Sequence, residues 1–250
     1  MKRQWVFVRG IMSESYHWSD FISKLQGLFP QDDFHTADIA GNGRLNQHLT
    51  PLSIEENVRL LRSQVPPHGR KILVGFSLGG MLAHEWAHHH PEDIHSLILI
   101  NSSFSNSPFY KRMTAKAFIK ILTLGLKRKI YQQEETILKM TTSLLSSQEI
   151  FELAKERHER NKEYPVKPLN FAWQLGVAAR ISQKKTPPAP TLLLSSAKDR
   201  VVHPQCSQKI AETWTLPLNV HPHAGHDLTL DDPNWVIEHI HRFIFSESDK

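Results

Sequence analysis

Short apolar runs separated by longer amphipathic stretches constrain the fold of this chain more than any other feature. The runs lie at residues 5–8, 71–76, 96–101 and 191–196, with a weaker one at 218–222. A strand that is apolar at successive positions is buried on both faces, which is typical of parallel sheets covered by helices. We therefore predict an α/β fold with a mostly parallel central sheet and helices on both of its faces.

The stretches between these runs have the apolar periodicity of covering helices, and we expect helices at residues 19–29, 53–65, 78–90 and 236–245. The helix at 53–65 opens with a capping box, because Glu56 follows Ser53 by three residues. The helix at 78–90 ends just before Pro91, which cannot continue it.

Residues 104–180 interrupt the alternation of strands and helices. Two long stretches in this region, 111–131 and 147–164, have the pattern of helices, and no clear strand accompanies them. We predict that residues 104–180 form an inserted helical lid. The α/β core would then consist of residues 1–103 and 181–250, a size that one domain accommodates.

Composition indicates the class of protein and the cellular compartment. A hydrophobic fraction of 40% and a charged fraction of 22% are typical of soluble globular proteins. The single cysteine, Cys206, excludes an intramolecular disulfide and indicates a reducing compartment. The four consecutive apolar residues at 5–8 are too few for a signal peptide or a membrane span. We expect a cytoplasmic protein.

A serine between a predicted strand and a predicted helix is the strongest chemical signal in the chain. Residues 75–79 read GFSLG, with Gly75 and Gly79 two positions either side of Ser77. This G-x-S-x-G pattern, between strand and helix, is typical of a nucleophile elbow. So tight a turn brings the residues flanking the serine close together, where a Cβ would collide. The alternative is a glycine-rich turn without chemistry.

A serine hydroxyl becomes a nucleophile only with a base and a carboxylate that orients the base. In this architecture the chain order is serine, acid, histidine. Asp199 follows the run at 191–196 and His226 follows the run at 218–222, so both belong at the carboxyl ends of parallel strands. We predict a catalytic triad of Ser77, Asp199 and His226. Weaker candidates for the acid are Asp227, Asp231 and Asp232.

Taken together, these motifs resemble the α/β-hydrolase family. The resemblance is carried by FVRG at 7–10, DIAGNGR at 38–44, GFSLGGMLAHEWAHHHPEDIHSLILIN at 75–101, AKDRVVHP at 197–204 and AGHDLTLDDP at 224–233. It implies an oxyanion hole formed by the backbone N–H groups of Ile11 and Leu78, and hydrolysis of a carboxylic ester through an acyl-enzyme without a cofactor or metal.

The chain departs from the family pattern at two positions. Arg9 stands where the family usually has histidine, and Ala40 stands where it usually has proline. We expect the arginine to change how the loop before Ile11 is braced. The same triad also serves lyases and carbon–carbon hydrolases, so these activities stay open, as does a non-catalytic binding protein. A metal cluster of His221, His223 and His226 is a further alternative.

The positive charge of the chain is concentrated in the predicted lid. The net charge is +5 for the whole chain, whereas residues 111–167 carry thirteen basic and seven acidic residues, or +6. A helix over 111–131 would place Arg112, Lys116 and Lys120 in one basic stripe, opposite an apolar side with Ala115, Phe118, Ile119 and Leu122. The stripe is either a solvated helix face or, together with Lys127 and Arg128, a docking surface for an acidic partner.

A basic lid combined with GFSLGG is similar to the esterases of biotin synthesis, which act on substrates linked to a strongly acidic acyl carrier protein. The resemblance makes such a carrier a candidate partner. Nucleic acid is a poorer explanation, because no recognition motif accompanies the charge. Residues beside the predicted nucleophile and at the start of the lid are candidates for substrate contact: Phe76, Phe109 and Tyr110.

Overall fold

A central parallel sheet organises the protein, as seen in a computed structural model that describes residues 2–124, 130–183 and 186–248. The sheet has six strands in the order β2-β1-β3-β4-β5-β6, and every neighbouring pair is parallel. The strands are β1 (Gln4–Val8), β2 (Asp33–Ala37), β3 (Lys71–Phe76), β4 (Ile94–Ile100), β5 (Thr191–Ser196) and β6 (Leu218–His221). The predicted fold class is confirmed.

Each apolar run of the sequence became a strand, but one strand was missed. β2 reads DFHTA and pairs only with β1, at the edge of the sheet. Four of its five residues are only half-buried. An edge strand with one covered face does not need a continuous apolar run, so its sequence carries a weaker signal.

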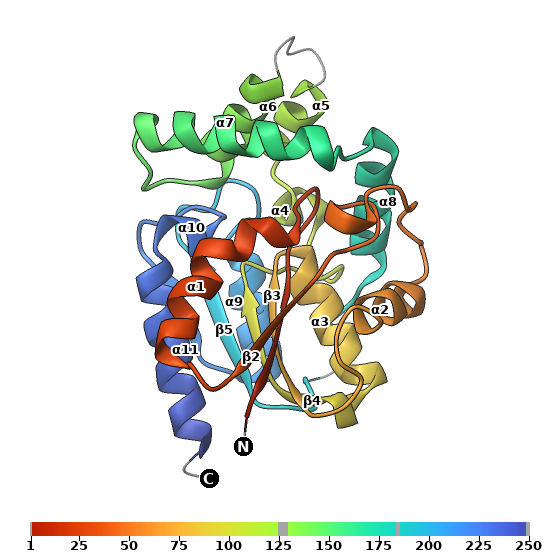
Figure 1. The fold of residues 1–250 in the computed structure, drawn as a ribbon, viewed down its shortest axis with the longest axis vertical. Helices are drawn as coiled ribbons and strands as arrows, with labels where there is room; N and C mark the ends of the chain where they lie inside the picture. Colours follow the sequence, from red (N-terminus) through yellow and green to blue (C-terminus); the bar gives the residue numbers. More distant parts are fainter. Residues whose placement is uncertain (1, 125–129, 184–185, 249–250) are drawn as a thin grey trace.

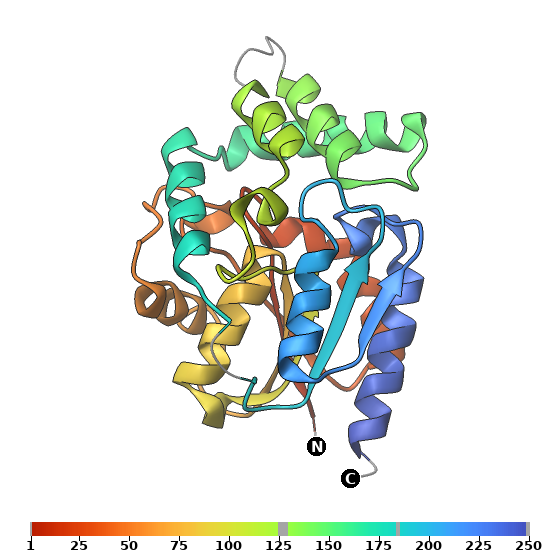
Figure 2. The same ribbon diagram turned by 180° about the vertical axis from the view of Figure 1, so that it is seen from behind.

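Helices cover both faces of the sheet, as Figures 1 and 2 show. One face packs against α1 (Ser19–Leu28) and α11 (Pro233–Ser248), around buried residues such as Trp18 and Ile240. The other face packs against α2 (Ile54–Arg62), α3 (Leu78–His89) and α9 (Gln205–Trp214). The capping box predicted for α2 is half present, because the Ser53 hydroxyl accepts from the backbone N–H of Glu56 at 3.1 Å. Helix α9 had not been predicted.

The described part of the chain between β4 and β5 contains helices and no strand. These helices are α4 (Phe109–Arg112), α5 (Ala115–Leu122), α6 (Ile130–Thr141), α7 (Ser147–Glu163) and α8 (Pro168–Arg180). Helices α5, α6 and α7 lie across the end of the core that is opposite the two termini (Figure 1). None of the helices that the structure describes is long and apolar enough to cross a membrane.

The predicted continuous helix over 111–131 is wrong at its start. Helix α4 ends at Arg112, and Thr114 begins a new helix by accepting the backbone N–H of Ala117 at 3.2 Å. Threonine at this position is a good N-cap, a signal that competes with helix continuation. Residues 125–129, which include Lys127 and Arg128, lie outside the described residues.

Candidate active site

Ser77 occupies the turn between β3 and α3. Its backbone has φ 54° and ψ −120°, a conformation that L-residues rarely adopt and that persists only when its surroundings hold it. The Ser77 N–H donates to the carbonyl of Ile100 at 2.9 Å, and the Ser102 hydroxyl donates to the Ser77 carbonyl at 3.0 Å. The end of β4 therefore fixes the strained residue on both sides.

The glycines on either side of Ser77 are required by close backbone approach. A Cβ on Gly75 would lie 2.4 Å from the Gly80 Cα, within the same turn, as the motif predicts. A Cβ on Gly79 would lie 2.2 Å from the Val8 carbonyl oxygen and 2.5 Å from that of Arg9. Gly79 is thus needed for a reason absent from the motif, because the end of β1 passes directly over the first turn of α3.

The loop after β1, which contains the predicted oxyanion-hole residue Ile11, starts beside the turn of Ser77. Because Val8 pairs with Gly75 across the sheet, the two loops start side by side. A Cβ on Gly10 would lie 3.0 Å from the Ser77 Cβ and 3.4 Å from its hydroxyl oxygen, so Ile11 follows a residue in contact with the serine. Leu78 begins α3, where backbone N–H groups have no acceptor inside the helix.

Asp199 and His226, predicted from separate motifs, are in contact at the carboxyl end of the sheet, which is the end that carries Ser77. Asp199 Oδ2 lies 2.7 Å from His226 Nδ1, with both side chains almost fully buried. Asp199 Oδ1 accepts the backbone N–H groups of Val201 and Val202 at 2.8 and 2.9 Å. These two bonds fix the carboxylate plane, so its other oxygen faces the imidazole.

Two further contacts hold His226 beside the turn of the serine. The His226 carbonyl accepts from the Asn101 side-chain amide at 2.6 Å. The imidazole packs against the ring of Phe76, the residue before Ser77, with centroids 4.8 Å apart. His226 is thus tied to the ends of β3 and β5, which Ser77 and Asp199 follow, and to the end of β4 through Asn101.

The weaker acid candidates have other partners. Asp231 accepts the backbone N–H groups of Ser143, Leu144 and Gly225. Asp232 lies 3.2 Å from His221 Nε2 and accepts the Trp235 N–H at 3.0 Å. Asp227 forms an ion pair with Arg9 at 2.6 Å.

The histidines of the alternative metal cluster are used differently. His221 Nδ1 accepts the backbone N–H groups of His223 and Ala224, so it shapes the loop that carries His226. Within the described ranges no group of three His, Cys, Asp or Glu side chains is arranged to hold a metal ion.

The predicted substrate-contact residues are placed unequally. Phe76 is 4% exposed and its ring contacts the His226 imidazole and the Arg9 guanidinium, so its placement does not favour contact with substrate. Phe109 and Tyr110 begin α4 and are largely exposed. Phe109 packs edge-on against Phe118 of α5, so these two residues remain candidates.

The basic stripe predicted on the lid differs from the surface that the structure shows. Arg112 is half-buried and donates to the carbonyl of Ala178 in α8, so it is not part of an exposed stripe. Ile119 and Leu122, expected on a buried side, are each 60% exposed. Helix α5 therefore presents Lys116 and the half-buried Lys120 together with two apolar side chains.

Sequence reasoning missed the buried amides that hold the loop after β1. Gln174 of α8 accepts the Met12 N–H at 3.0 Å and donates to the Asn42 side chain at 2.9 Å. Asn42 in turn donates to the Ser13 carbonyl at 2.9 Å. Asn42 lies within the quoted DIAGNGR motif, but the tertiary contact with Gln174 leaves no local pattern in the sequence.

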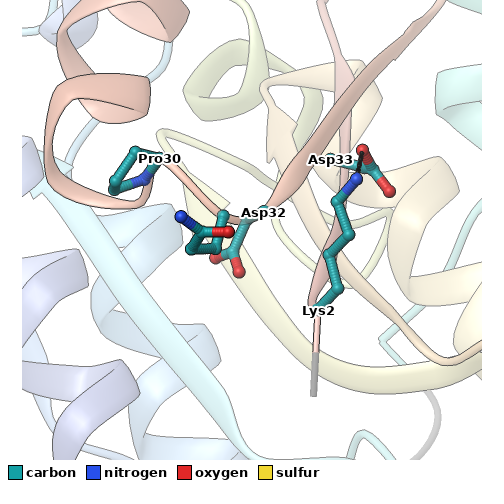
Figure 3. Close-up of a pocket in the computed structure, with 5 residues that line it drawn as sticks. Lys2, Pro30, Asp32 and Asp33 are labelled. Atoms are coloured by element: carbon teal, nitrogen blue, oxygen red, sulfur yellow. Dashed lines mark ion pairs between the residues drawn. The ribbon is translucent and has the colours of Figure 1, made fainter.

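A surface hollow of about 630 Å³ lies far from this site and does not contribute to it. Its lining includes Lys2, Pro30 and Asp33, at the amino ends of β1 and β2 (Figure 3). Lys2 and Asp33 form an ion pair at 2.6 Å. Ligand sites of parallel sheets lie at the carboxyl ends of the strands, which is the end that carries Ser77.

Comparisons with known proteins agree with this geometry. The model of the Alpha/beta hydrolase family matches residues 5–239. The pimeloyl-[acyl-carrier protein] methyl ester esterase of Edwardsiella ictaluri (strain 93-146) is 31% identical over 102 residues, which cover 41% of this chain and 37% of that protein. The enzyme of the same name from Vibrio vulnificus (strain YJ016) is 33% identical over 86 residues, covering 34% of this chain and 31% of that protein. The chain thus matches about a third of the length of these relatives.

Solved structures extend the likeness to the whole fold. The meta-cleavage product hydrolase of Pseudomonas fluorescens IP01 superimposes with a TM-score of 0.77 at 17% identity, covering 98% of this chain and 91% of that one. The enol-lactonase of Burkholderia xenovorans LB400 gives a TM-score of 0.72 at 14% identity, with 98% and 92% covered. At these identities the likeness concerns the fold alone.

Proposed function

Because the chain belongs to the alpha/beta hydrolase family, we propose that it is a serine esterase that cleaves a carboxylic ester through an acyl-enzyme. The observation that carries the proposal is the 2.7 Å contact between Asp199 and His226, at the edge of the sheet where Ser77 occupies its strained turn. Both side chains of the pair are buried, and strained backbone such as that of Ser77 is typical of functional sites.

In the proposed mechanism Asp199 accepts the Nδ1 proton of His226, which leaves Nε2 free to act as the base. His226 takes the Ser77 proton as the hydroxyl oxygen attacks the ester carbonyl, and then donates that proton to the departing alcohol. The backbone N–H groups of Ile11 and Leu78 stabilise the oxyanion, each contributing roughly 3 kcal/mol. Water then attacks the acyl-enzyme with His226 as base, releasing the acid.

A methyl ester linked to an acyl carrier protein is the more specific substrate that we propose. Two curated relatives with that name support it, although each alignment covers under half of this chain. Helix α5 adds physical support, because it carries Lys116 and Lys120 as well as the exposed Ile119 and Leu122. Positive charge around apolar side chains suits a partner with an acidic, partly apolar surface. A cytoplasmic location is part of this proposal.

One experiment tests both levels of the proposal. The protein is assayed on p-nitrophenyl esters of increasing acyl length and on a carrier-linked methyl ester, with Ser77→Ala as the control. We expect Ser77→Ala to lower kcat by about 10⁴-fold or more. Lys116→Glu combined with Lys120→Glu should raise KM about tenfold for the carrier-linked ester and leave p-nitrophenyl acetate unaffected, because only the carrier meets α5.

The outcomes separate the alternatives. If the protein hydrolyses small esters and the α5 double variant changes KM for neither substrate, the esterase proposal stands and the carrier proposal is wrong. No hydrolysis of any ester would favour a lyase, a carbon–carbon hydrolase or a binding protein.

A further inference from the structure

Arg9 lies at the centre of a buried charge cluster beside the candidate active site. Its guanidinium donates to both carboxylate oxygens of Asp227, at 2.6 and 3.3 Å, and to the Thr229 hydroxyl at 3.2 Å. The side chains of Arg9 and Asp227 are 3% and 4% exposed. A two-pronged arginine–carboxylate pair fixes orientation as well as distance, and burial protects it from screening by solvent.

The pair joins two loops that the proposed reaction needs. Arg9 directly precedes Gly10, the residue in contact with Ser77, and Ile11 follows. Asp227 directly follows His226. The two residues are 218 positions apart in the chain, so the ion pair is a direct link between the loop after β1 and the loop of the histidine.

Aromatic contacts place the guanidinium close to the imidazole. The Arg9 guanidinium carbon lies 4.4 Å from the centre of the Phe76 ring and 4.9 Å from that of Trp18. The Phe76 ring in turn contacts the His226 imidazole. The Phe76 ring therefore contacts both a buried positive charge and the proposed base.

The lid adds a second arginine to the same carboxylate. Arg157 of α7 is buried and lies 4.0 Å from Asp227 Oδ2. Burial alone would raise the pKa of Asp227, but the charges of Arg9 and Arg157 and the hydrogen bonds from Arg9 and Thr229 outweigh it and hold the pKa below its usual range. Asp227 is therefore ionised at neutral pH, one residue from His226.

We infer that Arg9 is a positioning residue, whose buried ion pair with Asp227 fastens the proposed oxyanion-hole loop to the His226 loop and balances the negative charge next to the imidazole. The expected effect of Arg9 on turnover rests on the proposed function. The charge balance around the imidazole is a property of the protein without substrate. The charged groups around the imidazole come from the loop after β1 (Arg9), the loop after β5 (Asp199), the His226 loop (Asp227) and α7 (Arg157). Two further titratable groups interact with these arginines: His17 with Arg9 and Arg157, and Glu134 of α6 with Arg157.

The test measures the titration midpoint of the His226 imidazole by NMR in the full chain, with the signal assigned by His226→Gln. Arg9→Met removes one of the two positive charges that balance Asp227 and should raise the midpoint by about one pH unit. Asp227→Asn leaves the arginines uncompensated and should lower it by a similar amount. Arg9→Lys, which keeps the charge, and the double variant Arg9→Met/Asp227→Asn should both return the midpoint toward that of the unaltered protein.

A purely structural brace predicts a different result. Both single variants would then shift the midpoint in the same direction, or leave it in place, and either result overturns the inference. Arg62→Met is the matched control, because it breaks the Arg62–Asp93 ion pair at the opposite end of the sheet and should not move the midpoint. Asp227→Asn keeps the test decisive should Arg9→Met fail to fold.

Turnover gives an independent readout of loop position. On p-nitrophenyl acetate, followed at the isosbestic wavelength of p-nitrophenol, Arg9→Met and Arg9→Lys should lower kcat about tenfold or more with little change in KM. Unchanged kcat in Arg9→Met would remove the positioning role. Failure of the unaltered protein to hydrolyse any ester would count against the proposed function, whereas the NMR result decides the inference by itself.

Discussion

At the scale of single residues, close approach of backbone atoms limits which side chains fit at the candidate site. Gly79 faces two carbonyl oxygens at the end of β1, at distances that a Cβ cannot occupy. Neither oxygen belongs to a flexible side chain, so the strand or the helix would have to move. That movement would shift Arg9 and Gly10, which lie in the same loop as the proposed oxyanion-hole residue Ile11.

We therefore expect Gly79→Ala to lower the free energy of unfolding by about 3 kcal/mol or more. The measurement is urea unfolding followed by circular dichroism. Gly27→Ala in α1 is the matched control, because no atom lies within 4 Å of its Cβ position. Gly27 lies in the last turn of α1, where that change should stabilise by about 0.5 kcal/mol. Equal effects of the two substitutions would contradict the steric account.

At the scale of elements, α6 and α7 are joined by a buried carboxyl group. Glu134 of α6 accepts from the Asn161 side chain of α7 at 2.7 Å. Burial raises the pKa of Glu134 above its ordinary value of 4.5, although the charge of Arg157 and the hydrogen bond from Asn161 act to lower it. The folded protein thus holds this proton more tightly than the unfolded chain does.

The sign of the pH effect follows from linkage. Because the folded pKa is raised, Glu134 lowers the free energy of unfolding as pH rises from about 4.5 through the folded pKa. Glu134→Gln removes this dependence, so its stability relative to the unaltered protein should increase over that range and then level off. Urea unfolding at a series of pH values measures it. Glu135→Gln, on the half-buried neighbour that pairs with Lys139, is the control for loss of a carboxylate from the same helix.

At the scale of the whole molecule, the inserted helices divide into two groups. Val177 of α8 packs in the same cluster as α2, α3 and the sheet. Leu138 of α6 and Ile150 and Ala154 of α7 instead form a separate small cluster, against which Leu230 of the core packs. Local stability follows buried apolar contact, so the two groups should open separately.

Hydrogen exchange followed by mass spectrometry tests this division. We expect the amides of α6 and α7 to exchange about 100-fold faster than those of α8, which corresponds to about 2.7 kcal/mol less opening free energy. Helix α8 should exchange at rates close to those of α3. Equal protection of α7 and α8 would show that the inserted segment opens as one unit.

The sequence by itself determined the parallel sheet and its helices, because continuous apolar runs and amphipathic periodicity are local consequences of burial. It also predicted Ser77, Asp199 and His226 as candidate catalytic residues, since each follows a strand and the glycines around Ser77 mark a tight turn. The edge strand β2 was not predicted, because a strand with only one covered face does not need a continuous run of apolar residues.

Only the tertiary structure decided how these parts hold one another. The contact of Arg9 with Asp227, the bond from Met12 to Gln174 and the approach of β1 to Gly79 join residues far apart in the chain. Likewise, Ile119 and Leu122 are exposed because Thr114 starts a new helix in a direction that the apolar pattern does not specify. Local patterns record which side chains need burial, whereas the partner that buries them depends on how the whole chain packs.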